Sequence, residues 1–222
     1  MITLRNVSKV YELDREPTFQ ALADVSLSIQ DGDMVGIMGP SGCGKSTLMH
    51  IIGLFDRPTS GDMTMNEKTV GKLNDDELSK FRNQTVGFVF QQFNLINKLT
   101  VLENVLLPTI YARRTFDQNP QEKARALLNR FGMTDKANSY PNKISGGQQQ
   151  RAAIARALIM DPALILADEP TGNLDSVNGK EILRLLSELH QKDKRTIVIV
   201  THDQTVARAT ERIIKTKDGK IV

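Results

Sequence analysis

Short apolar runs recur along the chain and alternate with stretches of helical periodicity. Four of these runs are continuous: MVGIM (34–38), VGFVF (86–90), ALILA (163–167) and TIVIV (196–200). Continuous runs of this length are typical of parallel strands that are covered on both faces. Near the N-terminus, ITLRNV and VSLSI also predict strands.

Helical periodicity occupies the segments between these runs. We expect helices over STLMHIIGLF, DDELSKFRN, QEKARALLNRFG, GGQQQRAAIARALIM and VNGKEILRLLSELHQK. In the last of them, the apolar positions between Ile182 and Leu189 fall on one helical face. Strands that alternate with helices along a chain predict an α/β fold with a mostly parallel sheet.

The 222 residues are enough for one large domain, or for a domain with a subdomain. Residues 93–160 contain no convincing strand and are mainly helical in pattern. We therefore predict a single domain, 1–222, in which a core of 1–92 and 161–222 carries an inserted helical subdomain, 93–160.

Charge and composition limit the functions to consider. The net charge of +3 is weak evidence for a nucleic-acid partner, because a mixed solvated surface explains it as well. No apolar stretch approaches the roughly 20 residues that cross a bilayer, and the N-terminal residues lack the apolar core of a signal peptide. The single cysteine excludes an internal disulfide. These features predict a cytoplasmic protein, which a partner can still hold at a membrane.

The segment GPSGCGKST (39–47) joins an expected strand to an expected helix. It matches G-x-x-x-x-G-K-[ST] in the strand-to-helix context that this motif requires. Glycines allow successive N–H groups to point at anionic oxygens, and the helix adds its positive N-terminal end. We therefore predict a loop that binds the phosphates of a nucleotide. The alternative is a glycine-rich turn without a ligand.

The side chains of this loop suggest separate tasks. Lys45 can reach the β- and γ-phosphates, Ser46 offers a hydroxyl ligand to Mg²⁺, and Thr47 suits the α-phosphate. Cys43 is either a small filler or a thiol whose alkylation blocks ATP binding. The candidate phosphate-binding residues are Gly39, Pro40, Ser41, Gly42, Cys43, Gly44, Lys45, Ser46 and Thr47.

Polar groups follow the other apolar runs, at the strand ends where open α/β sheets bind ligands. Asp168 is expected to hold Mg²⁺ through water, and Glu169 to activate the attacking water as general base. The alternative is an acidic pair that caps a helix before Pro170. Gln91 follows VGFVF and can contact Mg²⁺ or the attacking water. His202 follows TIVIV and can donate to the γ-phosphate.

Residues 144–151 read ISGGQQQR, directly before an expected helix. With the phosphate loop, Gln91, the Asp168–Glu169 pair and His202, the sequence resembles the ATP-binding-cassette (ABC) ATPases over nearly the whole chain. ISGGQ is similar to their signature motif, with Ile144 where leucine is usual. The resemblance implies an α/β fold: a P-loop NTPase core with a mostly parallel sheet, an N-terminal antiparallel β subdomain and an inserted α-helical subdomain.

The resemblance also implies roles for single residues. Tyr11 matches the aromatic residue that stacks on adenine, with an ordinary half-buried tyrosine at a strand end as the alternative. Gln91 matches the Gln-loop residue, Asp175 in GNLD the D-loop residue at the dimer contact, and His202 the switch histidine. The signature residues, implied to bind the γ-phosphate of a nucleotide held by a second subunit, are Ser145, Gly146, Gly147 and Gln148.

In this family the signature faces away from the phosphate loop of its own chain. One chain has one of each, so the resemblance implies a head-to-tail homodimer with two ATP molecules. The implied catalytic residues are Glu169, His202, Gln91 and Lys45. The implied ligands of the Mg²⁺ ion are Ser46, Gln91 and Asp168.

Three stretches, GLFDRPTSGD, VGFVFQQFNLI and ADEPTGNLD, are most similar to one subgroup of the family. Its members serve lipoprotein-releasing, macrolide- and peptide-exporting, and cell-division systems. The implied partner is an integral membrane permease of the FtsX/MacB type, which holds the ATPase at the cytoplasmic face of the plasma (inner) membrane. The sequence ends at Val222, so we expect no C-terminal regulatory domain of the kind that many importer ATPases carry, and this expectation favours export or mechanotransmission.

Residues that follow Gln91 are expected to form the groove for the permease, with burial in the subdomain core as the alternative. These residues are Phe93, Leu95, Asn97, Leu99 and Thr100.

Other functions stay open to different degrees. A cell-division ATPase that controls cell-wall hydrolases and transports nothing fits the cassette as well. DNA-repair relatives carry a long coiled coil and translation relatives carry two cassettes. Neither feature occurs here, so no nucleic-acid partner is expected. A simple kinase or GTPase leaves ISGGQ unexplained, and the sequence does not identify a transported substrate.

Overall fold

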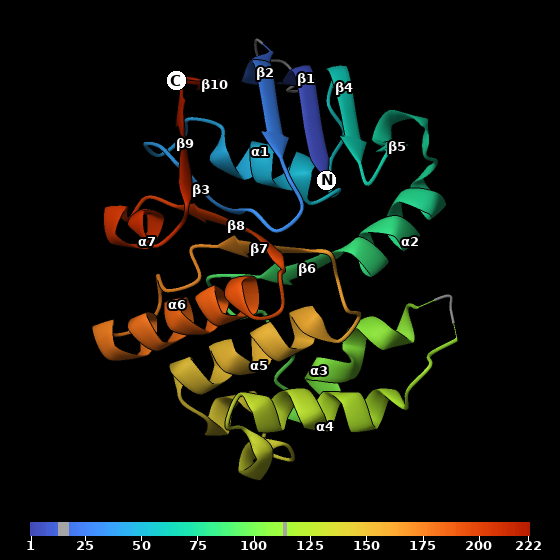
Figure 1. Ribbon diagram of the computed structural model, residues 1–222, viewed down its shortest axis with the longest axis vertical. Coiled ribbons are helices and arrows are strands. Elements are labelled where there is room, and N and C mark those ends of the chain that lie inside the picture. The colour runs from blue at the N-terminus through green and yellow to red at the C-terminus, as the bar shows by residue number, and fades with distance from the viewer. Residues whose placement is uncertain (13–17, 113–114) are drawn as a thin grey trace. The chain divides into compact units, whose positions relative to one another are not determined.

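The computed structural model describes residues 1–12, 18–112 and 115–222. The chain forms two compact units, and Figure 1 labels their helices and strands. Unit 1 comprises Met1–Arg82 and Thr196–Val222, and unit 2 comprises Asn83–Arg195.

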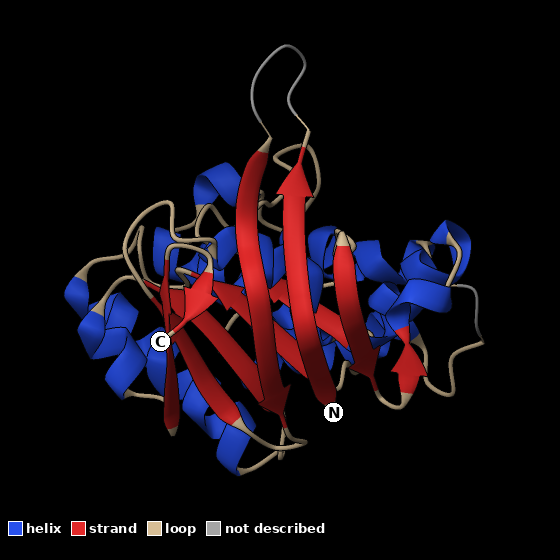
Figure 2. Cartoon of the chain, turned by 90° about the horizontal axis from the view of Figure 1, so that it is seen from above, coloured by secondary structure: helices blue, strands red, loops and turns tan. Residues whose placement is uncertain are grey.

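The described residues of unit 1 include an antiparallel sheet of four strands. In spatial order these are β2 (Phe19–Ile29), β1 (Ile2–Tyr11), β4 (Ser60–Met65) and β5 (Lys68–Thr69). β1 starts at the N-terminus and runs between two neighbours of the same sheet (Figure 2). Ile2 and Leu4 are buried and Thr3 is not, as expected when one face of an antiparallel sheet covers a core.

A second set of strands in unit 1 is parallel. β3 (Met34–Met38) lies between β8 (Thr196–Thr201) and β9 (Arg212–Lys217) and is parallel to both. β10 (Lys220–Ile221) returns antiparallel to β9. β3 and β8 consist almost wholly of buried residues, which confirms that MVGIM and TIVIV form covered parallel strands.

The helices of unit 1 connect these strands. α1 (Lys45–Ile52) follows β3 after the glycine-rich loop, and α7 (Gln204–Arg208) follows β8. A short 3₁₀ helix, η1 (Val70–Lys72), precedes α2 (Asp75–Thr85), which begins in unit 1 and ends in unit 2. α1 buries one apolar side, so its N-terminal end is fixed beside the loop.

Unit 2 contains two parallel neighbours, β6 (Val86–Val89) and β7 (Leu164–Asp168). Its helices are α3 (Val101–Ile110), α4 (Pro120–Arg130), α5 (Gly146–Leu158) and α6 (Ser176–Gln191), with 3₁₀ turns η2 (Thr134–Lys136) and η3 (Pro141–Lys143). α5 packs against β6 and the other three helices. A Cβ atom on Gly87 of β6 would lie 2.3 Å from the Ala157 carbonyl oxygen, so glycine allows this close approach.

The predicted mixed α/β architecture is confirmed. β6 and β7 correspond to VGFVF and ALILA, and the described residues between Phe93 and Met160 form no strand. The sequence pattern missed β4, β5, β9, β10, α3 and α7. The boundaries of the inserted helical subdomain stay a prediction. None of the described helices is both long enough and apolar enough to span a membrane.

Candidate active site

The glycine-rich loop lies between β3 and α1 in unit 1. Gly42 and Gly44 have φ angles of 75° and 95°, a left-handed conformation that residues with side chains rarely adopt. Gly44 is the N-cap of α1, and no side chain among the described residues caps this end of the helix. Backbone amides at the start of α1 can therefore donate to an anion, as expected of a phosphate-binding loop.

The loop packs directly against other parts of unit 1. A Cβ atom on Gly39 would lie 2.3 Å from the Thr216 carbonyl oxygen, and one on Gly44 would lie 2.5 Å from a carbonyl oxygen of β2. The amide of Gly219 also donates to the Cys43 carbonyl at 3.1 Å. β2, β9 and the turn after β9 therefore hold the loop backbone from outside.

The side chains of Lys45 and Cys43, two residues of this loop, contact the loop itself or the strand beside it. The Lys45 Nζ donates to the Gly39 carbonyl at 2.9 Å and to the Pro40 carbonyl at 2.7 Å. Phosphate oxygens would replace these carbonyls as its partners. Cys43 is 3% exposed and its Sγ lies 3.0 Å from the Thr216 Oγ1, a packing that agrees with a small filler. Ser46, by contrast, is exposed.

His202 lies beside the start of this loop. In the parallel register of β3 and β8, Met38 is paired with Thr201. The loop begins one residue after Met38, and His202 comes one residue after Thr201. Two predicted groups, the phosphate loop and an exposed histidine, therefore meet at one edge of the parallel strands of unit 1.

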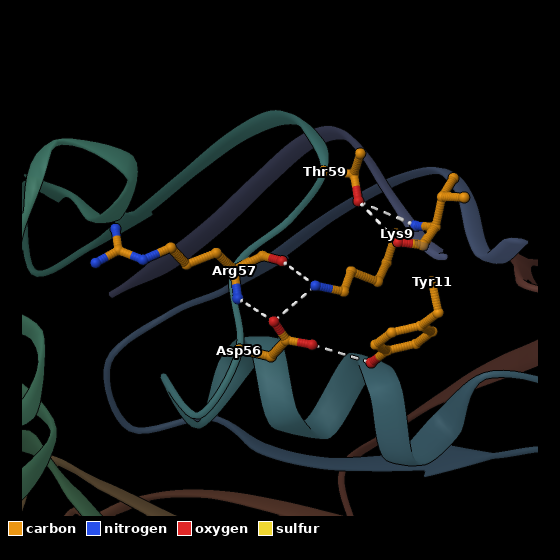
Figure 3. Close-up of polar contacts among 6 residues, drawn as sticks. Lys9, Tyr11, Asp56, Arg57 and Thr59 are labelled. Atoms are coloured by element: carbon orange, nitrogen blue, oxygen red, sulfur yellow. Dashed lines mark hydrogen bonds and ion pairs between the residues drawn. The ribbon is translucent and has the colours of Figure 1, made fainter. Parts of the chain in front are cut away.

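Tyr11, at the end of β1, belongs to a polar cluster (Figure 3). Its hydroxyl donates to the Asp56 Oδ2 at 3.0 Å, and the Lys9 Nζ lies 4.9 Å from the centroid of its ring. The same Nζ is 2.6 Å from the Asp56 Oδ1 and donates to the Arg57 carbonyl at 2.9 Å. The tyrosine is half-buried, so part of its ring stays accessible.

These contacts change the acidity of two groups. Burial raises the pKa of Tyr11, a hydrogen bond with Thr47 opposes the rise, and the Asp56 carboxylate adds to it. Thr47 belongs to the phosphate loop, so the tyrosine hydroxyl contacts both the loop and Asp56. Burial also pushes the pKa of Asp56 upward. Hydrogen bonds from Lys9, the Arg57 amide and the tyrosine outweigh burial and lower it.

No sequence motif assigns a role to Lys9 or Asp56. Asp56 lies within GLFDRPTSGD, a stretch that is similar to one subgroup of the family. Neither residue belongs to a motif with known spacing, so only the contacts of the folded chain identify them.

In unit 2, β6 and β7 carry the other predicted hydrolytic groups. The strands are parallel neighbours. Gln91, two residues after β6, and Asp168, the last residue of β7, therefore lie at the same edge. Asn173 holds Gln91 from two sides: its Nδ2 donates to the Gln91 carbonyl at 3.0 Å, and the Gln91 Nε2 donates to the Asn173 Oδ1 at 3.4 Å. Glu169 has a φ angle of 42°, an uncommon conformation for a residue with a side chain.

Asp168 and Glu169 do not cap the helix that follows them. That helix, α6, begins at Ser176 and is capped by Asp175, which accepts from the amides of Val177 at 3.0 Å and Asn178 at 2.9 Å. The hydrogen bonds from Asn178 and Val177 lower the pKa of Asp175. The alternative of an acidic pair that caps this helix is therefore wrong, and Asp175, predicted as a D-loop residue, has the capping role.

The signature segment forms the start of α5. Ser145 is the N-cap, and it forms a capping box with Gln148: the Gln148 amide donates to the Ser145 Oγ at 3.3 Å, and the Ser145 amide donates to the Gln148 Oε1 at 3.0 Å. A Cβ atom on Gly147 would lie 2.3 Å from the Asn178 Oδ1. The glycine therefore lets α6 pack close to the first turn of α5. Ser145 itself is exposed.

The residues predicted to form the permease groove lie in the segment between β6 and α3. Asn97 is exposed and the other four are partly buried, so the permease groove stays a prediction beside the alternative of packing in the subdomain core. Arg156 of α5 fixes the start of this segment by donating to the carbonyls of Phe93, at 2.7 Å, and of Asn94. Burial lowers the pKa of Arg156 to about 10, so it stays charged at neutral pH.

The predicted magnesium ligands are a hydroxyl, an amide and a carboxylate. The described residues contain no group of three or more His, Cys, Asp or Glu side chains that could hold a metal ion. Mg²⁺ commonly takes one or two protein oxygens and completes its shell with phosphate oxygens and water. Ser46, Gln91 and Asp168 have side-chain oxygens of this kind, so their chemistry fits a nucleotide-bound ion.

Comparison with known proteins identifies the family of the chain. A family model described as ABC transporter matches residues 22–172. The uncharacterized ABC transporter ATP-binding protein MJ0796 of Methanocaldococcus jannaschii is 51% identical over all of this chain and 95% of its own length. The uncharacterized ABC transporter ATP-binding protein YvrO of Bacillus subtilis is 47% identical over all of this chain and 96% of its own.

Longer relatives and solved structures agree. The macrolide export ATP-binding/permease protein MacB of Chlorobaculum tepidum is 48% identical over the whole chain, which spans 34% of that protein. A dimeric structure of MJ0796 in a post-hydrolysis state, bound to ADP and Pi, has a TM-score of 0.90 at 49% identity, covering all of this chain and 96% of that one. The chain belongs to the ABC transporter family, as one of its ATP-hydrolysing cassettes.

Proposed function

We propose that this cassette works as a head-to-tail homodimer that hydrolyses two ATP molecules and drives a separate membrane permease. One observation carries the proposal. The sequence has one phosphate loop, 39–47, and one signature segment, 144–148, and in this family the two contact different nucleotides, so two complete sites need two copies. The dimeric structures of the relative MJ0796 support the same assembly.

Residues of the chain divide between two nucleotides in this proposal. The phosphate loop, Tyr11 and His202 contact the ATP of their own subunit, as do the hydrolytic groups Gln91 and Glu169. The exposed Ser145 and the start of α5 contact the γ-phosphate of the other subunit's ATP. Asp175 contacts the second subunit from the start of α6.

Hydrolysis then needs one proton acceptor and several anion partners. Glu169 accepts a proton from water while the water oxygen attacks the γ-phosphorus. The bond from that phosphorus to the oxygen bridging to the β-phosphate breaks, and ADP and phosphate are released. Lys45 and His202 donate to the charge that develops on the phosphate oxygens. A bound Mg²⁺, held by Ser46, Gln91 and Asp168, would neutralise part of the phosphate charge.

The proposed permease partner rests on a relative in which both functions share one chain. MacB is named as an ATP-binding/permease protein, and this chain matches only its ATP-binding third. We propose a permease of the FtsX/MacB type, contacted by the partly exposed segment after Gln91. Binding to it would place the cassette peripherally at the cytoplasmic face of the membrane.

The dimer is tested with the Glu169→Gln variant, which binds ATP but lacks the general base. With ATP and Mg²⁺ we expect it to elute as a dimer in size-exclusion chromatography. Glu122→Gln, the same change on the exposed first turn of α4, is the matched control and should elute as the parent protein does. Elution of Glu169→Gln as a monomer at every ATP concentration contradicts the proposal.

The permease is tested by capture. Tagged Glu169→Gln with ATP and Mg²⁺ is bound to detergent-solubilised membranes of its host, and co-purified proteins are identified by mass spectrometry. A permease with few spans and a large outer domain is the expected companion. Recovery of ribosomes or DNA without a membrane protein contradicts the transport role and leaves the ATPase chemistry intact.

A further inference from the structure

Gln150 lies on α5, two residues after the signature segment, and the sequence motifs give it no role. Its side chain is fully buried, and its Nε2 donates to the Pro170 carbonyl at 2.6 Å and to the Phe90 carbonyl at 3.4 Å. Both partners can only accept. The amide must therefore present its NH₂ group, with one hydrogen for each carbonyl.

These two carbonyls stand next to the proposed hydrolytic groups. Phe90 directly precedes Gln91, and Pro170 directly follows Glu169. A left-handed backbone at a residue with a side chain, as at Glu169, persists only when its surroundings hold it. One buried amide thus helps to fix the backbone beside both groups.

Burying a glutamine in this way lowers the stability of the fold. The Gln150 Oε1 is buried and has no hydrogen-bond partner among the residues that the structure describes. An apolar side chain of the same size would avoid the penalty of an unsatisfied buried oxygen. Positions that break a packing rule in this way are expected at functional sites, where another requirement decides the residue.

A second residue of α5 also forms hydrogen bonds with the segment after β6. Arg156, nearly two turns further along the helix, donates to the carbonyls of Phe93 and Asn94. The first turn of α5 is closed by the capping box of Ser145 and Gln148. The helix therefore joins the signature segment at one end to the backbone around Gln91 along its length.

We infer that Gln150 is a positioning residue that couples the signature end of α5 to the backbone carrying Gln91 and Glu169. The inference rests on the proposed function, in which the signature contacts one nucleotide while Gln91 and Glu169 serve the other. Engagement of the signature at the first nucleotide is then transmitted through α5 to the hydrolytic groups at the second.

The first test is Gln150→Met, which keeps the length of the side chain and removes both donors. We expect kcat for ATP hydrolysis to fall about tenfold or more, because displacements of about 1 Å at a reacting group can cost about 100-fold. KM and the affinity for a fluorescent ATP analogue should not change. In the Glu169→Gln background the ATP-stabilised dimer should persist. A folded variant with the kcat of the parent protein overturns the inference.

A second variant keeps the inference testable if Gln150→Met does not fold. In Gln150→Glu, burial and two facing carbonyl oxygens favour a protonated carboxyl, which nearly matches glutamine in shape and retains one donor. Its kcat, relative to the parent protein, should fall as pH rises from 6 to 9 and the donor is lost. Gln121→Glu, at an exposed helix position, should show a constant ratio. A constant ratio for Gln150→Glu overturns the inference.

Different results contradict the proposed function and the role of Gln150. If the parent protein does not hydrolyse ATP, or Glu169→Gln does not dimerise, the proposed function is wrong. If the parent protein is active and both Gln150 variants match it in kcat and pH profile, only the coupling role of Gln150 is wrong.

Discussion

Replacing Asp56 with asparagine removes the negative charge from the cluster that holds Tyr11. The carboxylate accepts from the Lys9 Nζ, the Arg57 amide and the tyrosine hydroxyl. The side chains of Lys9 and Asp56 are 13% and 29% exposed, so solvent screens this pair only in part. Hydrogen bonds to charged groups contribute about 1.5–3 kcal/mol, and asparagine keeps weaker versions of them. We expect the free energy of unfolding to fall by about 1–2 kcal/mol at pH 7.

The difference in the free energy of unfolding between the parent protein and Asp56→Asn should depend on pH in one direction. The folded-state pKa of Asp56 lies below its usual value of 3.8. A depressed carboxyl pKa stabilises the folded protein fully above the unfolded-state pKa, and the contribution is lost as pH falls through the folded-state value. The gap between the parent protein and Asp56→Asn should therefore be constant at neutral pH and narrow below about pH 4.

The assay is urea unfolding of both proteins at several pH values between 7 and 3. Asp75→Asn is the control, because Asp75 pairs with Arg57 at 2.8 Å but its side chain is 98% exposed, and no measurable loss is expected. No gap at pH 7, or a gap as large at pH 3 as at pH 7, refutes the reasoning from the partly buried ion pair.

Three further predictions concern the loop and α5. Gly44→Ala should weaken ATP binding more than tenfold in a fluorescence titration, because φ is 95° there and the new Cβ atom would meet a backbone oxygen of β2 at 2.5 Å. Arg156→Met should lower the free energy of unfolding by about 2 kcal/mol in urea, since it leaves the carbonyls of Phe93 and Asn94 without their charged donor. Iodoacetamide should react slowly with the buried Cys43 and then block ATP binding, whereas Cys43→Ser should bind ATP with or without the reagent. Normal binding by fully alkylated protein contradicts this last prediction.

The strands that the hydrophobic pattern predicted share one property: their own residues are apolar enough to indicate that they are buried. β3 and β8 are apolar at nearly every position, and this requires cover on both faces. β4 reads SGDMTM and β9 reads RIIKTK, and each buries only two of its six residues. Such strands form because a neighbouring strand pairs with their backbone N–H and C=O groups. Pairing of this kind depends on partners that the segment itself does not specify.

The candidate site divides in a similar way. Residues proposed to bind the nucleotide and its Mg²⁺, such as Lys45 and Ser46, occur at fixed spacing because the ligand has fixed dimensions, so the motif identifies them. Supporting residues are chosen by contacts between distant segments: Tyr11 and Asp56 are 45 positions apart, and Gln150 and Phe90 are 60 apart. No local pattern can predict these pairs, since only the folded chain brings them together.

The structure of unit 2 also explains why α5 is suited to transmit a signal. Four of its eight buried residues are alanine, and the Ala157 carbonyl approaches β6 so closely that only glycine fits at position 87. The helix therefore cannot slide along β6 without a clash. Gln150 and Arg156 then tie it to the chain that leaves β6, on either side of Gln91. A displacement at the signature end of α5 is therefore expected to move the segment of Gln91 or to break these hydrogen bonds.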